Sequence, residues 1–111
     1  MSTIGAIDLN NAHRALVLAI LRAHLPPGAK VYVFGSRALG RAKAYSDLDL
    51  AIDAGRPLSL DESAALAEAF SNSDLPWKVD VVDWRTIEDR FRRIIEAERT
   101  LLAEVGRETR G

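Results

Sequence analysis

The sequence predicts an α/β fold of the α+β kind, in which helices pack against a small mixed sheet of three strands. Two observations support this prediction. Apolar residues recur at helical spacing in three long segments, and three short segments rich in β-branched residues alternate with them. The length of 111 residues suits one domain, so we expect a single domain over residues 1–111.

The composition excludes several classes of protein. Lys and Arg number 15 against 16 Asp and Glu, and a net charge of -1 lacks the basic excess typical of nucleic-acid binding. The absence of cysteine excludes disulfides and thiolate metal sites. The longest apolar run, at 15–21, is far shorter than the about 20 residues that cross a bilayer. The amino terminus does not resemble a secretory signal, so we expect a cytoplasmic protein without membrane contact.

The first half of the chain is predicted to form a helix, a strand, a turn and a second strand. Residues 8–28 have helical spacing, with Asp8 or Asn10 as the cap, and Pro26 and Pro27 end the helix because proline removes a donor. Residues 30–34 form a short β-branched and aromatic strand. Residues 35–40 form a turn that contains one helical turn. The alternation over 46–52 then predicts the second strand.

The second half is predicted to form a helix, a strand and a longer helix. Residues 59–73 begin with Ser59 and Glu62, which have the Ser-x-x-Glu spacing of a capping box. Residues 77–84 read as the third strand. From about Thr86 to Gly106 we expect one long helix with a continuous apolar face, made of Ile87, Phe91, Ile94, Ile95, Leu101, Leu102 and Val105.

The connection between the first two strands limits how they can pair. Residues 35–45 are short for a crossover that carries a full helix, which usually takes about a dozen residues or more. We therefore expect these strands to run antiparallel. In that arrangement Gly35 and Ser36, at the exit of the first strand, lie beside Asp47 and Asp49, at the entry of the second.

Two aspartates lie on one face of the predicted second strand. Side chains alternate along a strand, so Asp47 and Asp49 share one face, while Leu48, Leu50 and Ile52 share the other and face the core. Neighbouring carboxylates repel unless a cation neutralises them, and oxygen ligands favour Mg²⁺ or Mn²⁺. For the pair alone, one solvated aspartate and one turn cap is the more frequent arrangement.

A third carboxylate strengthens the metal hypothesis. If Val79 and Val81 point into the core, Asp80 points to the open face of the sheet, toward the other two aspartates. Asp83 then lies at the end of the strand, as a cap or a surface charge for the following helix. The opposite register, with Asp83 as the third carboxylate, stays open because Val82 is apolar too.

The turn after the first strand is a candidate phosphate site. Gly35 permits close backbone approach, Ser36 adds a hydroxyl, and the amides of 36–38 at a helix start would suit an anion. Arg37, Arg41 and Lys43 could neutralise a triphosphate, with Arg37 the first choice, although a solvated loop explains each of them singly. Phosphates on one side and Mg²⁺ on the other predict a nucleoside triphosphate site.

Together these residues resemble the DNA polymerase β-like nucleotidyltransferase superfamily, and above all its minimal nucleotidyltransferase (MNT) branch. The resemblance rests on Gly35-Ser36, ten intervening residues, Asp47 and Asp49, and Asp80 on a later strand, and it covers nearly the whole chain. It implies a nucleotidyltransferase core that moves AMP from ATP to a hydroxyl group. In that scheme the three aspartates hold two Mg²⁺ ions, and the Gly-Ser pair fixes the β- and γ-phosphates.

The resemblance also implies a partner protein. MNT proteins are typically antitoxins paired with an all-helical HEPN ribonuclease, so we expect transfer of AMP to a tyrosine hydroxyl of such a toxin, in a hetero-oligomer without direct nucleic-acid contact. Leu39 stands where MNT proteins often carry a second arginine. The alternatives are a catalytically silent antitoxin that neutralises its partner by binding alone, and an enzyme that adenylylates a small molecule such as an aminoglycoside.

Overall fold

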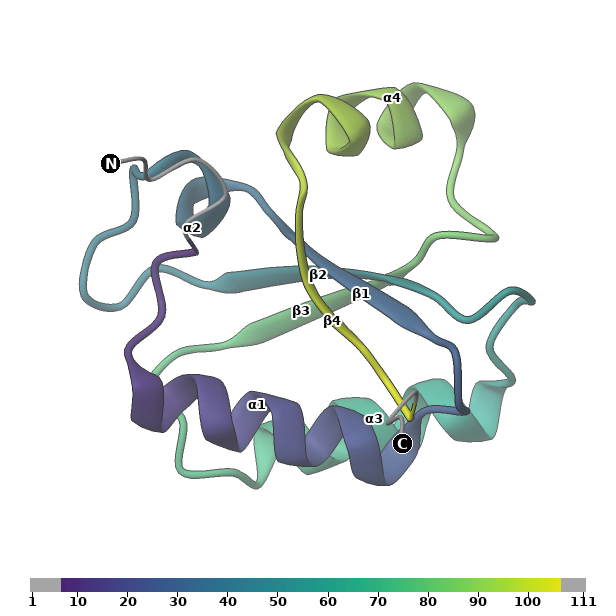
Figure 1. Cartoon of the computed structure of the whole chain (residues 1–111), viewed down its shortest axis with the longest axis horizontal. Coiled ribbons are helices and arrows are strands. Elements are labelled where there is room, and N and C mark those ends of the chain that lie inside the picture. Colours follow the sequence, from purple (N-terminus) through teal and green to yellow (C-terminus); the bar gives the residue numbers. More distant parts are fainter. Residues whose placement is uncertain (1–6, 107–111) are drawn as a thin grey trace, which may run out of the picture.

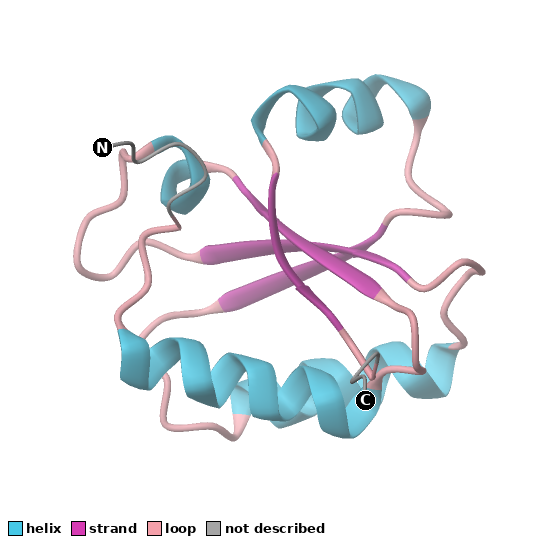
Figure 2. Ribbon diagram, viewed as in Figure 1, coloured by secondary structure: helices cyan, strands magenta, loops and turns pink. Residues whose placement is uncertain are grey.

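The computed structural model describes residues 7–106, which form one four-stranded sheet with helices on both faces (Figure 1). Helices α1 and α3 cover one face and α4 lies on the other (Figure 2). Within 7–106, none of the helices has the length and apolarity of a membrane span. In chain order the elements are α1 (Asn11–His24), β1 (Lys30–Phe34), α2 (Ser36–Leu39), β2 (Leu48–Asp53), α3 (Leu60–Ser71), β3 (Val79–Asp83), α4 (Asp89–Glu98) and β4 (Thr100–Glu104).

The sheet is mixed, with the strand order β3-β2-β1-β4. Strands β1 and β2 run antiparallel, as the short connection predicted, and Phe34 lies opposite Asp49. Strands β2 and β3 run parallel, because α3 provides the crossover between them. The exit of β1 therefore lies beside the entry of β2, and the entry of β3 lies on the other side of β2.

The end of the chain differs from the prediction of one long helix. Helix α4 ends at Glu98, where Arg99 takes an extended backbone with φ -72° and ψ 149°, and 100–104 pairs antiparallel with β1 as a fourth strand. Leu101 and Leu102 are adjacent, so they fit a helical face and a strand equally well. The strand is favoured because it pairs with the edge of β1, whose backbone N–H and C=O groups would otherwise lack partners.

The two predicted helix caps have the expected chemistry. The Asn10 side chain, not Asp8, accepts a hydrogen bond from the amide of His13 at 2.7 Å and begins α1. Ser59 and Glu62 form the predicted capping box of α3, with each side chain accepting from the other residue's amide. Helix α1 ends at His24, just before the two prolines.

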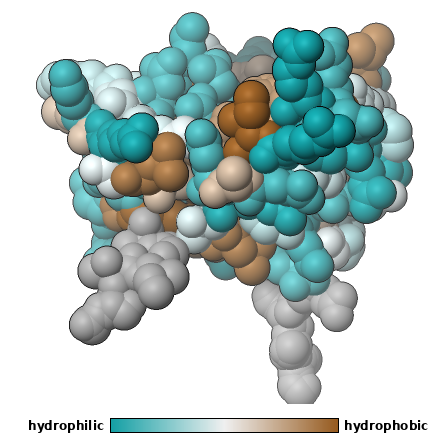
Figure 3. Space-filling view, turned by 90° about the horizontal axis from the view of Figure 1, so that it is seen from above, coloured by the Kyte–Doolittle hydropathy of each residue, from teal (hydrophilic) through white to brown (hydrophobic). Residues whose placement is uncertain are grey.

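The main core lies between the sheet and the α1/α3 layer. Its fully buried large side chains come from both helices and from the two central strands, namely Val17, Leu21, Val31, Val33, Leu48, Leu50, Ile52 and Leu66. A smaller apolar cluster lies under α4 on the opposite face and consists of Phe34, Ala51, Trp84 and Ile95. Phe91 and Ile94 of α4 are partly exposed, and the ring of Phe91 meets Phe34 of this cluster edge-on at 5.9 Å. Seen from above, the surface is mostly hydrophilic, with small apolar patches (Figure 3).

Candidate active site

Asp49 and Asp80 are direct neighbours across the β2–β3 pair. The parallel register aligns Asp49 with Asp80, and both point away from the main core because the residues that flank them pack into it. Val79 and Val81 pack against that core, which is the register that the valines predicted. The sheet thus brings together two carboxylates that lie far apart in the sequence, and Asp47 enters just ahead of β2.

The surroundings of Asp49 disfavour its negative charge. Its pKa is raised to about 6, first by burial and then by the negative charges of Asp80, Asp47 and Glu98. A bound divalent cation would relieve this repulsion. The donor set consists of carboxylate oxygens, which fits Mg²⁺ or Mn²⁺.

The carboxylates of residues 7–106 are too far apart in this structure for three of them to bind one metal ion together. Within residues 7–106, no three His, Cys, Asp or Glu side chains are gathered closely enough to hold a metal ion. Asp47 and Asp80 are exposed, whereas Asp49 is half-buried. The two exposed side chains have room to turn, and they would have to approach Asp49 to complete a cation site.

The Gly-Ser turn packs directly against Asp49. Gly35 has a φ of 76°, which favours glycine, and a Cβ atom at this position would overlap Oδ2 of Asp49. The turn leads into the short helix α2, which begins at Ser36. The amide of Ala38 donates to the carbonyl of Gly35 at 3.0 Å, so the predicted row of amides over 36–38 is partly used within the turn.

Glu98 is a fourth carboxylate at this site, and the sequence analysis missed it. Its Oε1 accepts a hydrogen bond from the amide of Gly35 at 3.1 Å, across 63 positions of sequence. Its negative charge also contributes to the raised pKa of Asp49. No sequence signal identifies Glu98, because a single glutamate at the end of a predicted helical face has the pattern of an ordinary solvated residue.

Arg37 is buried and does not reach toward the open side of the site. Its guanidinium donates to the backbone carbonyls of Asp8, Ala44 and Ser46 and lies 4.5 Å from the centre of the Trp77 ring. These contacts favour a structural part for Arg37 over the nucleotide contact that the sequence suggested. Arg41 and Lys43 are exposed in the loop ahead of β2, as solvated residues or phosphate contacts would be.

Asp83 has a structural place at the end of β3. Its carboxylate accepts from the amide of Leu58 at 2.8 Å and from the amide of Arg85 at 3.0 Å. It was expected to cap the following helix, but α4 begins only at Asp89 and has Glu88 as its cap residue. Asp83 therefore joins the end of β3 to the segment before α3.

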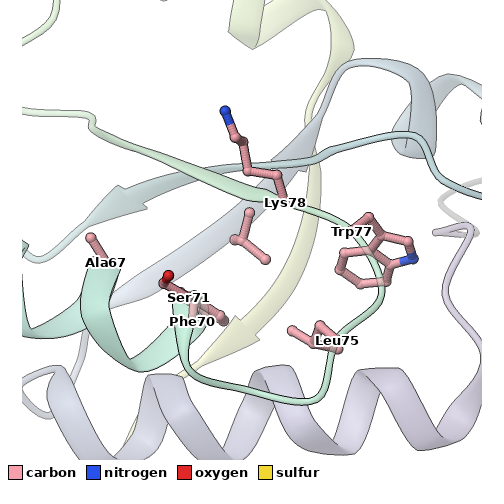
Figure 4. A pocket seen from close by; sticks show the side chains of 7 residues that line it. Ala67, Phe70, Ser71, Leu75, Trp77 and Lys78 are labelled. Carbon is pink, nitrogen blue, oxygen red and sulfur yellow. The ribbon is translucent and has the colours of Figure 1, made fainter.

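A cavity of about 210 Å³ lies on the other face of the sheet, away from the carboxylates. It opens between α3, the loop that follows it and the start of β3 (Figure 4). Its lining is formed by Ala67, Phe70, Ser71, Leu75, Trp77, Lys78 and Val79, none of which was predicted as a site residue.

Comparison with known proteins identifies relatives of this chain. Residues 15–102 match the family model described as "Nucleotidyltransferase domain". The Haemophilus influenzae protein named "Probable protein adenylyltransferase MntA" is 47% identical over 95 residues, covering 86% of this chain and 82% of the relative.

Two solved structures have a similar fold. A toxin–antitoxin crystal structure with AMP-PNP has a TM-score of 0.71 and 26% identity, covering 83% of this chain and 73% of that one. A complex of a tri-AMPylated Shewanella oneidensis HEPN toxin with an MNT antitoxin has a TM-score of 0.62, covering 83% and 70% of the two chains. At 24% sequence identity, this structural likeness shows a shared fold and no more.

Proposed function

The chain belongs to the nucleotidyltransferase domain family, and from this premise we propose that it transfers AMP from ATP to a hydroxyl group of a HEPN ribonuclease toxin and so acts as the antitoxin. The observation that carries the proposal is the pairing of Asp49 with Asp80 on adjacent strands, directly against the Gly35 turn. The relative named as a protein adenylyltransferase and the toxin–antitoxin structure with AMP-PNP support the same activity.

The proposed roles are those that the family resemblance implies, and the placement of the side chains supports them. Asp47 and Asp49 would hold two Mg²⁺ ions, and Asp80 would bind the ion nearer the acceptor. When bound, the ions stabilise the entering and leaving oxygens of an in-line displacement. Gly35 and Ser36 would bind the β- and γ-phosphates, because the Gly35 turn brings backbone against the carboxylates without a side chain in between.

The chemical step is a substitution at the α-phosphorus of ATP. The acceptor oxygen, which we propose to be that of a tyrosine, forms a bond to this phosphorus, the bond to the bridging oxygen breaks, and pyrophosphate leaves. The proton of the acceptor hydroxyl passes to a carboxylate. Asp80 is the candidate for this base, because it is exposed on the open face and a docked partner can reach it.

Label transfer tests the proposal directly. The protein is incubated with ATP labelled in its α-phosphate, Mg²⁺ and the product of the neighbouring gene, which we expect to be the HEPN toxin, and label in that product is measured. We expect label in the toxin with the parent and no label with the double variant Asp47→Asn, Asp49→Asn. Asp74→Asn serves as the matched control, because it removes an exposed carboxylate in the loop between α3 and β3.

Two further measurements, of toxin neutralisation and of pyrophosphate release, separate the alternatives. Equal neutralisation of the toxin by the parent and the double variant would favour a silent antitoxin that acts by binding. Release of pyrophosphate with an aminoglycoside alone would favour a small-molecule adenylyltransferase. Label transfer by the double variant at the parent's rate would contradict the assignment of the carboxylates.

A further inference from the structure

Arg37 is a buried cation that has no carboxylate partner among residues 7–106. It is 5% exposed, and it is the buried charged side chain in the part of the chain that the structure describes. The ion pairs within residues 7–106 are Arg56–Glu62 and Arg85–Asp53, so no carboxylate there neutralises Arg37. Burying an unpaired charge is unfavourable unless hydrogen bonds satisfy it. A side chain held in this way is expected to have a specific role.

Backbone carbonyls accept the hydrogen bonds of the guanidinium, and two of its nitrogens donate to the same carbonyl oxygen. Nε donates to the Ser46 carbonyl at 3.1 Å and Nη2 donates to the same oxygen at 2.9 Å. Nη2 also lies 3.4 Å from the Ala44 carbonyl oxygen. Ser46 directly precedes Asp47, so this carbonyl belongs to the peptide bond whose nitrogen is that of Asp47. The contact therefore fixes the backbone one bond before a predicted metal ligand.

The other contacts of Arg37 hold it in place. Nη1 donates to the Asp8 carbonyl at 2.8 Å, and the Asp8 amide donates back to the Arg37 carbonyl at 2.9 Å. The guanidinium carbon lies 4.5 Å from the centre of the Trp77 ring, and the ring of His13 meets the same Trp edge-on at 5.3 Å. Contacts with the segment before α1 and with the residues just before β3 thus hold the guanidinium in place, and the guanidinium in turn holds the end of the loop.

The loop ahead of β2 has few other ties to the body of the protein. Its internal hydrogen bonds join residues of the same short turn: the Ser46 amide donates to the Lys43 carbonyl, and the Lys43 amide donates to Ser46 Oγ. The Arg41 amide reaches back to the Ser36 carbonyl at the beginning of the loop. The side chain of Arg37 ties the end of the loop, on the N-terminal side of Asp47, to the rest of the fold, and on the other side of Asp47 the Leu48 amide donates to the Lys78 carbonyl at 2.9 Å.

We propose that Arg37 is a positioning residue for the carboxylate site: it fixes the Ser46–Asp47 peptide so that Asp47 can join Asp49 in cation binding. This inference rests on the proposed function, since it assigns Asp47 a ligand role. It also explains why an arginine occupies the position. A planar guanidinium can present two N–H groups to one carbonyl and stack on an aromatic ring, whereas a lysine ammonium offers a single nitrogen and no flat face.

The test compares Arg37→Lys with the parent in two measurements. The first is the affinity of the nucleotide-free protein for Mn²⁺, by calorimetry. We expect the affinity to fall by about tenfold or more, as when a residue that orients metal ligands is replaced. The second is the rate of tryptic cleavage after Arg41 and Lys43, which are exposed in the loop. We expect this rate to rise by about the same factor, because the end of the loop is released.

A core variant separates positioning from general destabilisation. Leu66→Ala removes a fully buried side chain of α3 on the far face of the sheet and should lower thermal stability without changing Mn²⁺ affinity or loop cleavage below its unfolding transition. Parental Mn²⁺ affinity or an unchanged cleavage rate in Arg37→Lys would overturn the positioning role. A parent that binds no Mn²⁺ would count against the proposed function, and the cleavage rates would still show whether Arg37 fixes the loop.

Discussion

Replacing Asp49 with asparagine should stabilise the protein at neutral pH when no divalent cation is present. Burial and three neighbouring carboxylates raise the pKa of Asp49 from 3.8 to about 6, so its charged form is less favourable in the folded chain than in the unfolded one. Asparagine has nearly the same shape and carries no charge. The variant therefore keeps the packing of the site and removes the repulsion.

The size of the effect follows from the pKa shift. A shift of about two pH units corresponds to about 3 kcal/mol in the free energy of unfolding. Because Asp49 is only half-buried, solvent screening reduces this to about 1–2 kcal/mol. For a domain of this size that gain should raise the melting temperature by about 4–8 °C.

The pH dependence gives the sign of the effect. Below the unfolded pKa of 3.8 the carboxyl is protonated in both states, so the parent and Asp49→Asn should differ little. As the pH rises from about 4 to 6, the unfolded chain releases the proton and the folded chain keeps it, so the parent loses stability. Above about pH 6 the variant should have its full advantage.

Thermal unfolding in EDTA at pH 4 and pH 7.5 measures this difference, with Asp53→Asn as a control on the same strand. Burial opposes ionisation of Asp53, but the hydrogen bonds from Arg85, at 2.8 Å, and from the Gly55 amide, at 2.9 Å, together with the positive charges of Arg85 and Lys30, outweigh it and lower the pKa of Asp53. Asp53→Asn should therefore lose stability at pH 7.5, the opposite of Asp49→Asn. If Asp49→Asn did not raise the melting temperature at pH 7.5, or raised it equally at both pH values, the electrostatic reasoning would be refuted.

Three further changes test the site and the fold. Gly35→Ala should lower the melting temperature and remove ATP binding measured by calorimetry, because position 35 has a positive φ and an added Cβ would overlap Asp49. Gly28→Ala is the control: position 28 also has a positive φ but open space around it, so ATP binding should be kept. Glu98→Gln should lower the pKa of Asp49 in an NMR titration, and an unchanged pKa would show that the Glu98 charge has no influence there. Ser59→Ala should cost about 1 kcal/mol in urea unfolding through loss of the capping box, and a cost near zero would contradict that assignment.

Local sequence patterns were sufficient for the elements whose chemistry is local. The alternation of Leu48 and Leu50 with Asp49 set the face of each residue on β2, and the valines around Asp80 did the same on β3. A strand with one apolar face has a single register that buries it, so the sequence placed Asp49 on the open face and favoured the same face for Asp80, although Val82 left the other register of β3 open. The parallel pairing that sets the two aspartates opposite each other is a property of the tertiary structure. The capping box at Ser59 is likewise complete within four residues.

The end of the chain and one contact of the site depended on tertiary structure. The segment 100–104 fits a helix or a strand by periodicity, and the unpaired edge of β1 selected the strand. The ending of α4 at Glu98 then brought this carboxylate to the Gly35 amide.

The sequence by itself determined which residues face the core, where the turns fall and which carboxylates share a face of the sheet, because these properties repeat with the local period of the chain. Only the tertiary structure decided that Glu98 joins the site and that Arg37 is buried under the loop before Asp47. Both depend on contacts between segments distant in the sequence, Glu98 with the Gly35 amide and Arg37 with the Asp8 carbonyl. The physical reason is that a long-range hydrogen bond is set by where whole elements pack, and no local pattern records that position.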